Sequence, residues 1–206
     1  MIVRRARRLG MCAGVRRGLA LVEKALRDNP STPVFTLGEL VHNPAVVDEY
    51  RARGVTPVDD PRSVSAGVVV IRTHGVDPST RASCERPGVR CVDATCPKVR
   101  RIQKLVEERH RTGWSVIVVG DPGHDEVRGI VGYAPGCRVV ATVEEATTVP
   151  CGGKTLVVSQ TTLARSAYER IAAVLSSRCP GVEIADTTCP STEERRTALV
   201  ELASEV

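Results

Sequence analysis

The chain has 206 residues, of which 42% are hydrophobic and 26% are charged, and its formal net charge at pH 7 is +5. This length allows one large domain or two ordinary ones, and the balance of residues excludes intrinsic disorder. No apolar run approaches the ~18 residues of a membrane span and no export signal is visible, so we expect a cytoplasmic protein with reduced cysteines and no membrane contact.

The positive charge favours an anionic partner. The chain contains one Trp, three Tyr and one Phe, too few to build a surface on which nucleic-acid bases could stack. We therefore expect a phosphorylated small molecule as ligand and no nucleic acid.

Five apolar runs rich in β-branched residues are typical of strands that are buried on both faces. They lie at 33–37, 67–73, 114–120, 137–142 and 155–159. Helical patterns separate them, which predicts parallel βαβ units folded into small three-layer α/β lobes.

Cys12, Cys96 and Cys189 lie at nearly equal intervals, and each opens a helix-like run behind a small-residue turn. This periodicity indicates one unit used three times. The predicted fold is α/β, a pseudo-threefold trefoil of small parallel-sheet lobes whose third lobe is incomplete. We expect an N-terminal segment with the first cysteine, two α/β lobes and the start of a truncated third lobe, at 1–13, 14–96, 97–188 and 189–206.

Three convergent thiolates predict a metal site. A soft ligand set without a fourth protein ligand fits an iron–sulfur cluster, which would keep one iron open to substrate. Zinc is the alternative, although structural zinc sites usually pair ligands two to four residues apart and the chain contains no CxxC. The cysteines outside the repeat are expected to be core or surface residues: Cys84, Cys91, Cys137, Cys151 and Cys179.

Polar side chains follow the predicted strands, where functional groups of parallel sheets collect. His42, His74 and His124 lie in such loops and could form an anion site, because histidine donates to phosphate and adds charge when protonated. Glu126 could donate a proton if the cavity raises its pKa, and the hydroxyl of Thr161 could relay that proton.

Several of these segments resemble signatures of the 4-hydroxy-3-methylbut-2-enyl diphosphate reductases, the LytB family, in the same order along the chain. GMCAGVRR is similar to the family's G-F-C-A-G-V signature, GELVHNP to its E-x-V-H-N segment and RTHGV to its S/T-H-G-V loop. DATCPKV, GHDEVRG and SQTTL resemble the next three signatures. The family's later Ser-x-Asn motif has no counterpart in these 206 residues.

The resemblance implies an iron–sulfur reductase of the non-mevalonate isoprenoid pathway. It implies a [4Fe-4S] cluster on Cys12, Cys96 and Cys189, and reductive dehydroxylation of the hydroxylated diphosphate to isopentenyl and dimethylallyl diphosphate.

By position, the resemblance assigns diphosphate binding to His42, His74 and His124, with His124 also near the proton path. It assigns proton donation to Glu126 and its support to Thr161, and it implies a ferredoxin or flavodoxin as electron donor. The alternative is a non-catalytic iron–sulfur binding or assembly module that a partner chain completes.

Overall fold

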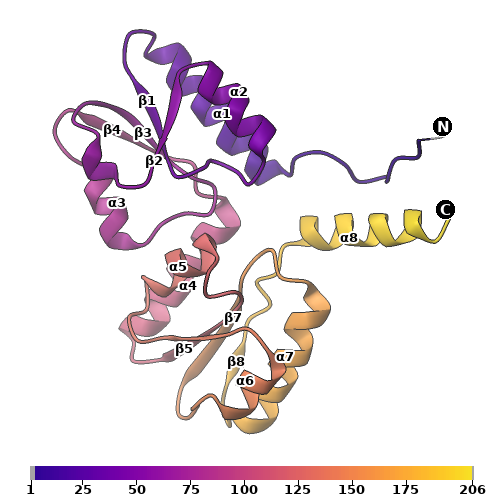
Figure 1. The fold of residues 1–206 in the computed structure, drawn as a ribbon. Helices are drawn as coiled ribbons and strands as arrows, with labels where there is room; N and C mark the ends of the chain where they lie inside the picture. The colour runs from indigo at the N-terminus through magenta and orange to yellow at the C-terminus, as the bar shows by residue number, and fades with distance from the viewer. Residues whose placement is uncertain (1–2, 206) are drawn as a thin grey trace.

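The computed structural model describes residues 3–205, which contain two parallel four-stranded sheets, each covered by helices (Figure 1). The strand order is β2-β1-β3-β4 in the first sheet and β6-β5-β7-β8 in the second, so the two sheets have the same topology. The elements in chain order are α1 (Ala13–Asp28), β1 (Val34–Leu37), α2 (Pro44–Ala52), β2 (Val55–Val58), the 3-10 turn η1 (Pro61–Ser63), β3 (Gly67–Ile71), α3 (Pro78–Cys84), β4 (Val89–Asp93), α4 (Pro97–Arg111), β5 (Ser115–Val119), α5 (Asp125–Val131), β6 (Arg138–Val140), α6 (Val143–Thr148), β7 (Thr155–Ser159), α7 (Arg165–Arg178), β8 (Glu183–Ile184) and α8 (Pro190–Ala203).

The first lobe has three layers, because the central strand β3 is apolar on both faces. Val68 and Val70 pack with residues of α1 and α2, whereas Val69 and Ile71 pack on the opposite face with Cys84 of α3. All five residues of β3 are buried. Alternate residues of a strand point to opposite faces, so a continuous apolar run serves two cores.

Helix starts in this lobe follow the usual capping chemistry. The Asn43 side chain accepts a hydrogen bond from a backbone N–H in the first turn of α2, and Asp77 does the same at α3. Pro44 and Pro78 occupy the first helical positions, where a missing N–H costs nothing. The strand-end loops therefore end at defined residues.

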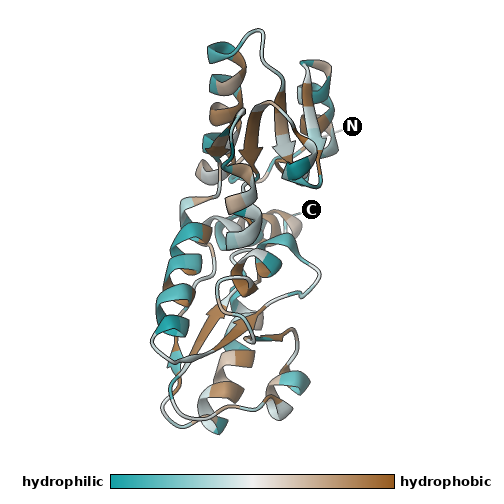
Figure 2. Ribbon diagram, turned by 90° about the vertical axis from the view of Figure 1, so that its left-hand side faces the viewer, coloured by the Kyte–Doolittle hydropathy of each residue, from teal (hydrophilic) through white to brown (hydrophobic). Residues whose placement is uncertain are grey.

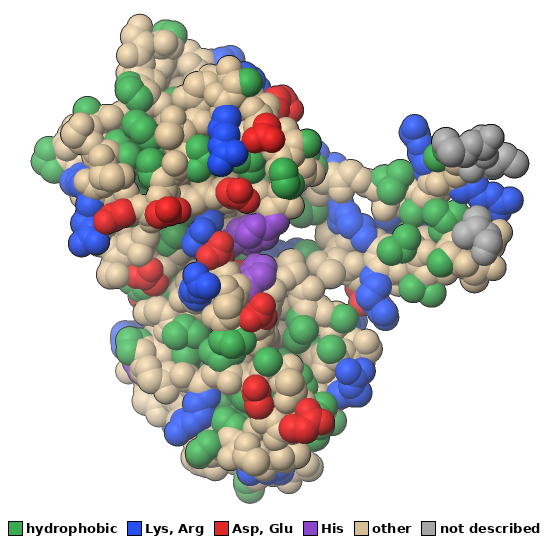
Figure 3. Space-filling model, viewed as in Figure 1, with side chains coloured by type: hydrophobic (Ala, Val, Ile, Leu, Met, Phe, Trp, Pro, Cys, Tyr) green, Lys and Arg blue, Asp and Glu red, His purple; other side chains and the backbone are tan. Residues whose placement is uncertain are grey.

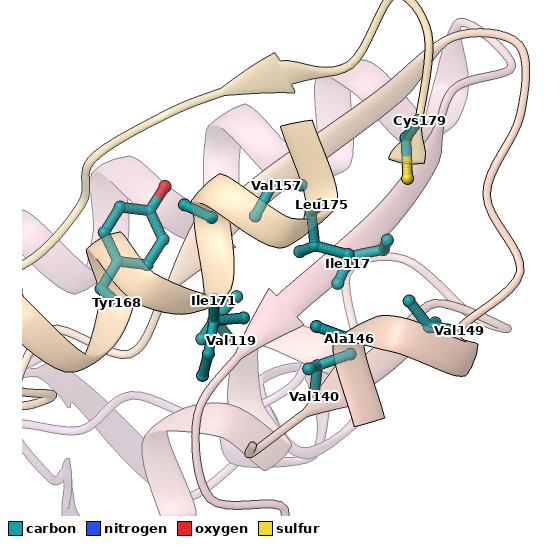
Figure 4. Packing of buried hydrophobic residues seen from close by; sticks show 11 residues of the cluster. Ile117, Val119, Val140, Ala146, Val149, Val157, Tyr168, Ile171, Leu175 and Cys179 are labelled. Carbon is teal, nitrogen blue, oxygen red and sulfur yellow. The ribbon is translucent and has the colours of Figure 1, made fainter. Parts of the chain in front are cut away.

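The second lobe repeats this architecture. On one face of its sheet, α6 and α7 pack over Ile117 and Val157, with Tyr168, Ile171 and Leu175 of α7 in the cluster (Figure 4). The helices α4 and α5 cover the other face. Hydrophobic residues accordingly concentrate in the strands, and the hydrophilic residues of the helices face outward (Figure 2). Within residues 3–205, every helix is too short or too polar to cross a lipid bilayer.

The prediction of an α/β protein built on parallel sheets is confirmed. The five predicted strands correspond to β1, β3, β5, β6 and β7. The sequence prediction missed β2, β4 and β8 because edge strands need only partial burial. Pro57 lies in β2, Arg90 and Asp93 lie in β4, and β8 has two residues, so none of these strands gives a continuous apolar run.

Two cysteines differ from the expectation of reduced thiols. Cys151 and Cys179 form a disulfide, with Cα atoms 5.6 Å apart, that joins the segment before β7 to the end of α7. Cys179 is buried in the core of the second lobe, and Cys151 packs against that core. The pairing was not visible in the sequence because 28 residues separate the two cysteines.

The N-terminal segment and α8 extend together from the side of the molecule (Figure 1). Ion pairs link them, including Arg7 with Glu201 at 2.9 Å and Arg8 with Glu194 at 3.8 Å. Arg195 of α8 also donates to the carbonyl oxygen of Gly10 at 2.9 Å. Apolar side chains on this arm, which comprises residues 3–11 and α8, are exposed: Val3, Leu9, Leu199 and Val200.

The two lobes meet where α5 packs on the loop that follows β3. Gly129 of α5 lies against the backbone of Val76, and a Cβ built on Gly132, directly after α5, would overlap the Cβ of Asp77. Glycines at these positions let the helix approach the loop closely. The contact between the lobes therefore depends on the absence of side chains at one position in α5 and at the residue that follows the helix.

We expect Gly132→Ala to weaken this contact. The added methyl group would overlap Asp77 and force α5 away from the first lobe, lowering the free energy of unfolding by about 1–3 kcal/mol, as overpacking commonly does. Urea denaturation followed by circular dichroism measures the change. Gly152→Ala is the matched control, because a Cβ there meets nothing within 4 Å. Equal stability of the two variants would contradict the packing described.

Candidate active site between the lobes

A cavity of about 370 Å³ opens where the two lobes and the start of α8 meet. Its wall combines thiols, an imidazole, a carboxyl group and a hydroxyl with apolar side chains. The functional residues that line it are Cys12, Cys96, Cys189, His74, Glu126 and Thr161. Of the residues proposed from the sequence, His42 and His124 are not part of this wall.

Each of the three cysteines is the residue immediately before a helix. Cys12 precedes α1, Cys96 precedes α4 and Cys189 precedes α8, and none of their side chains caps its helix by a hydrogen bond. The sulfur atoms are thus free to face the cavity. Helix N-termini carry partial positive charge, which stabilises an anionic group at this position.

The backbone anchors two of the cysteines in the same way. The N–H of Cys96 donates to the carbonyl oxygen of Thr73 at 2.9 Å, in the loop after β3. The N–H of Cys189 donates to the carbonyl oxygen of Thr161 at 2.8 Å, in the loop after β7. Each lobe therefore holds its C-terminal cysteine against its own central strand-end loop.

An aspartate two residues before a threonine N–H shapes the turn ahead of each of these cysteines. Asp93 accepts from the N–H of Thr95 at 2.9 Å, and Asp186 accepts from the N–H of Thr188 at 3.0 Å. Such aspartate turns fix the backbone locally. The DATC and DTTC strings in the sequence have the same structural meaning.

The space between the sulfurs suits a group larger than a single ion. A Cβ built on Gly14 would lie 2.7 Å from the Sγ of Cys96 and 3.8 Å from the Sγ of Cys12, so glycine at this position lets the Cys96 sulfur approach the first turn of α1. In the described part of the chain, the cysteines do not form a group compact enough for a single ion. Three thiolates on zinc, at about 2.3 Å each, would have to lie within about 4 Å of one another.

The three histidines form a second cluster beside the cavity. The rings of His42 and His74 stack with centroids 4.4 Å apart, and the ring of His124 meets them edge-on at 5.7 Å and 5.4 Å. Their nearest ring nitrogens lie within 4.8 Å of one another. In the space-filling view, histidine side chains occupy the seam between the lobes with charged residues around them (Figure 3).

Burial favours the neutral form of two of these histidines, His74 and His124. It lowers the pKa of His74 to about 4, with repulsion from His42 and His124 as smaller causes, and it also lowers the pKa of His124. The Nδ1 of His124 accepts the N–H of Glu126 at 3.1 Å, so the neutral ring carries its proton on Nε2. The Nδ1 of His74 is buried without a hydrogen-bond partner among residues 3–205.

Glu126 and Thr161 form a closed hydrogen-bonded pair, and the side chain of Glu126 is almost fully buried. The N–H of Thr161 donates to Oε1 at 2.5 Å, and the Thr161 hydroxyl lies 2.7 Å from Oε2. Burial raises the pKa of Glu126, against the opposing effect of both hydrogen bonds. Because Oε1 is occupied as an acceptor, the carboxyl proton belongs on Oε2, where it faces the threonine hydroxyl.

Two buried glutamines support the site, and sequence reasoning missed Gln103. The Gln103 amide lies 3.4 Å from the carbonyl oxygen of Val76 and contacts the loop that carries His74. Gln160 accepts the N–H of Asp121 at 3.1 Å, which joins the loops after β5 and β7. Gln160 stands beside Thr161 in the SQTTL string, whereas Gln103 lies in a highly charged helix that gave no signal.

A thiol-lined cavity between two repeated parallel α/β lobes, with a buried acid on its wall and imidazoles beside it, defines an α/β enzyme whose active site lies between the lobes. The family described as LytB protein has a sequence model that matches residues 3–206. The chain belongs to this family, whose curated members carry the name 4-hydroxy-3-methylbut-2-enyl diphosphate reductase.

The reductase of Treponema denticola is 36% identical over 220 residues, and the match covers 100% of this chain and 76% of that protein. The reductase of Caldanaerobacter subterraneus subsp. tengcongensis is 34% identical, with 98% of this chain and 71% of that protein covered. The chain thus spans about three quarters of the length of these relatives.

Solved structures support the fold assignment. A structure of (E)-4-hydroxy-3-methyl-but-2-enyl diphosphate reductase, described as the terminal enzyme of the non-mevalonate pathway, is 32% identical and superposes with a TM-score of 0.80. That match covers 98% of this chain and 73% of the other. The reductase of Plasmodium falciparum is 28% identical, with a TM-score of 0.88 over 95% of this chain and 63% of the other.

We expect Glu126→Gln to stabilise the protein at alkaline pH. The pKa of Glu126 is higher in the folded than in the unfolded chain, so its favourable contribution is complete below about pH 4.5 and is lost as pH rises through the folded-state pKa. Above that value the buried carboxylate opposes folding, which the neutral amide avoids.

Thermal denaturation between pH 5 and 8.5 tests this expectation. The melting temperature of Glu126→Gln relative to the unsubstituted protein should rise with pH. Glu107→Gln is the control, since Glu107 is exposed on α4 and its substitution should give a difference that does not change with pH. A pH-independent difference for Glu126→Gln would contradict the raised pKa.

Proposed function

We propose that this chain catalyses the reductive dehydroxylation of (E)-4-hydroxy-3-methylbut-2-enyl diphosphate. The C–O bond of the allylic hydroxyl breaks, two electrons and two protons are consumed, and the products are water and isopentenyl or dimethylallyl diphosphate. One proton leaves with the hydroxyl as water and the other forms a C–H bond. Membership in a family of enzymes with this name supports the proposal.

The observation that carries the proposal is the composition of one cavity wall. Three cysteines and the Glu126–Thr161 pair line the same 370 Å³ cavity, so a reductant and a proton source would act at one place. A non-catalytic binding module would have no need of a buried acid there, because burying a carboxyl group costs stability. This cost favours the enzymatic interpretation over a cluster-binding module.

We assign the cofactor as a [4Fe-4S] cluster held by Cys12, Cys96 and Cys189. Soft thiolates suit iron–sulfur clusters, and in the described part of the chain the three cysteines are not grouped compactly enough for a single zinc ion. When bound, the cluster supplies electrons and an iron without a protein ligand. A ferredoxin or flavodoxin is the proposed source of those electrons.

The diphosphate is assigned to His42, His74 and His124. Imidazoles bind phosphate oxygens by donating hydrogen bonds, and the Nε2–H of His124 is available for this role. Their compact arrangement could also hold a divalent ion. Arg72, whose charge acts on both His74 and His124, favours an anion in that place.

Glu126 is the proposed proton donor, and Thr161 relays the proton. The raised pKa of Glu126 keeps its acid form available at higher pH than an exposed glutamate would allow. The proton passes from Oε2 to the Thr161 oxygen as the threonine releases its own hydroxyl proton into the cavity. The N–H of Thr161 holds the carboxyl group in the orientation this transfer needs.

Loss of a ligand should abolish cluster retention. We expect Cys96→Ser to lose the iron and the visible absorption near ~400 nm after anaerobic reconstitution, because a hydroxyl is a poor ligand for iron–sulfur clusters. Cys91→Ser is the matched control. Cys91 lies five residues earlier in β4, faces Cys84 in the core and should leave the iron content unchanged. Equal loss in both variants would overturn the ligand assignment.

Turnover tests the proton path. With reduced methyl viologen as electron source, we expect Glu126→Gln to lower kcat by about 10²–10⁴-fold, because general acid catalysis contributes factors of this size. Thr161→Val should give a smaller loss, since the acid remains but its relay is removed. Product analysis should show both isoprenoid diphosphates for the unsubstituted protein, and full kcat in Glu126→Gln would contradict the assignment of the acid.

A further inference from the structure

We infer that Arg72 is a positioning residue that fixes the distances between the three histidines by joining the segments that carry them. The inference rests on the proposed function of the histidines as the diphosphate site. It concerns the seam between the lobes, outside the cavity wall described above.

The first contact of Arg72 crosses from one lobe to the other. Arg72 follows β3 and precedes the loop of His74, and its Nη1 lies 2.8 Å from Oδ2 of Asp125 in α5. Asp125 stands between His124 and Glu126 in the chain. Both side chains of the ion pair are about one-fifth exposed, so solvent screens the pair less than it screens surface ion pairs.

The second contact is with the segment that leads to His42. Gly38 follows β1 and has a φ of +67°, a left-handed conformation that glycine adopts without strain. A Cβ on Gly38 would lie 2.5 Å from Nη1 of Arg72, so the guanidinium group rests directly on this backbone. One side chain therefore touches or adjoins the three segments on which the histidines are carried.

The hydrogen bonding of Arg72 is incomplete. Its Nε is buried and has no partner within residues 3–205. A buried donor without a partner costs stability, and native proteins concentrate such exceptions at functional positions. Arg72 thus contacts both lobes at the seam, although its Nε lacks a hydrogen bond there.

The histidine rings lie so close together that the Arg72–Asp125 ion pair can affect their arrangement. The centroids of the histidine rings lie 4.4 to 5.7 Å apart, and the rings come from both lobes. A misplacement of about 1 Å in a positioned site can cost a factor of about 10². Without the ion pair between Arg72 and Asp125, only the packing of α5 would hold His124 close to the other two rings.

The substitution Asp125→Asn distinguishes two effects of the ion pair on anion binding, the positioning of the histidines and the charge of the carboxylate. Removing a negative charge beside an anion site should tighten pyrophosphate binding if charge alone matters. If the ion pair positions the histidines, Asp125→Asn should weaken binding by about 10-fold despite the favourable change in charge. Arg72→Met should weaken pyrophosphate binding by at least as much. The affinity of the double variant should be no more than about twofold below that of whichever single variant binds less tightly.

Isothermal titration calorimetry of the cluster-loaded protein with inorganic pyrophosphate, at pH 8, provides the measurement. This pH lies above the ordinary pKa of histidine, and burial lowers the pKa of His74 and His124 further in the unsubstituted protein. Arg72→Lys keeps a cation within reach of Asp125 and should recover most of the affinity. Arg128→Met is the matched control, because Arg128 contacts the same carboxylate at 3.7 Å from an exposed position on the same helix, and its affinity should stay within twofold.

Steady-state kinetics with the hydroxylated diphosphate should show a raised KM for Asp125→Asn and Arg72→Met. The kcat of these two variants should fall less than threefold. Tighter or unchanged pyrophosphate binding by Asp125→Asn, or multiplicative effects in the double variant, would overturn the positioning role while leaving the proposed function intact. Failure of the unsubstituted protein to bind pyrophosphate would instead overturn the assignment of the histidines and, with it, this inference.

Discussion

The approach of α5 to the loop after β3 is the constraint on which the rest of the site depends. The two sheets have separate hydrophobic cores, so packing within one lobe does not fix the position of the other lobe. The glycines of α5 allow a close contact with residues 76–78, and this contact brings the start of the helix to the imidazole of the first lobe. Because α5 begins directly after His124 and carries Glu126, one packing contact sets the positions of both residues.

The polar groups of the site are held in environments that oppose their charged forms. Glu126 is buried with two hydrogen bonds to one threonine, and His74 is buried beside two other imidazoles. Burying these polar groups lowers the free energy of unfolding. Continuous apolar strands such as β3 and β7, which pack on both faces, offset this cost. The cores are therefore rigid where the site needs fixed positions, and the site residues are free to have unusual proton affinities.

Much of this arrangement was accessible from the sequence, and the limits have physical causes. Buried central strands such as β3 were predicted because a strand that packs on two faces must be apolar throughout, whereas the edge strand β4 tolerates Arg90 and Asp93. The spacing of the cysteines predicted their equivalence, and each proved to precede a helix. The pair Arg72–Asp125 was not predicted, because an ion pair between lobes leaves no periodic signal. The disulfide was missed because pairing across 28 residues requires knowledge of the fold.

The arm formed by residues 3–11 and α8 is attached differently from the lobes. Its two segments lie at opposite ends of the sequence and are joined by pairs such as Arg7 with Glu201, both well exposed to solvent. Attraction between exposed charges is screened over about 10 Å at 0.1 M salt, whereas apolar packing is not weakened in this way. The direction of α8 beyond Cys189 is therefore sensitive to ionic strength, while the lobes that carry Cys12 and Cys96 are not. Dissolved ions therefore act on the far turns of α8, whereas the backbone hydrogen bond from Cys189 to Thr161 keeps the start of this helix in place.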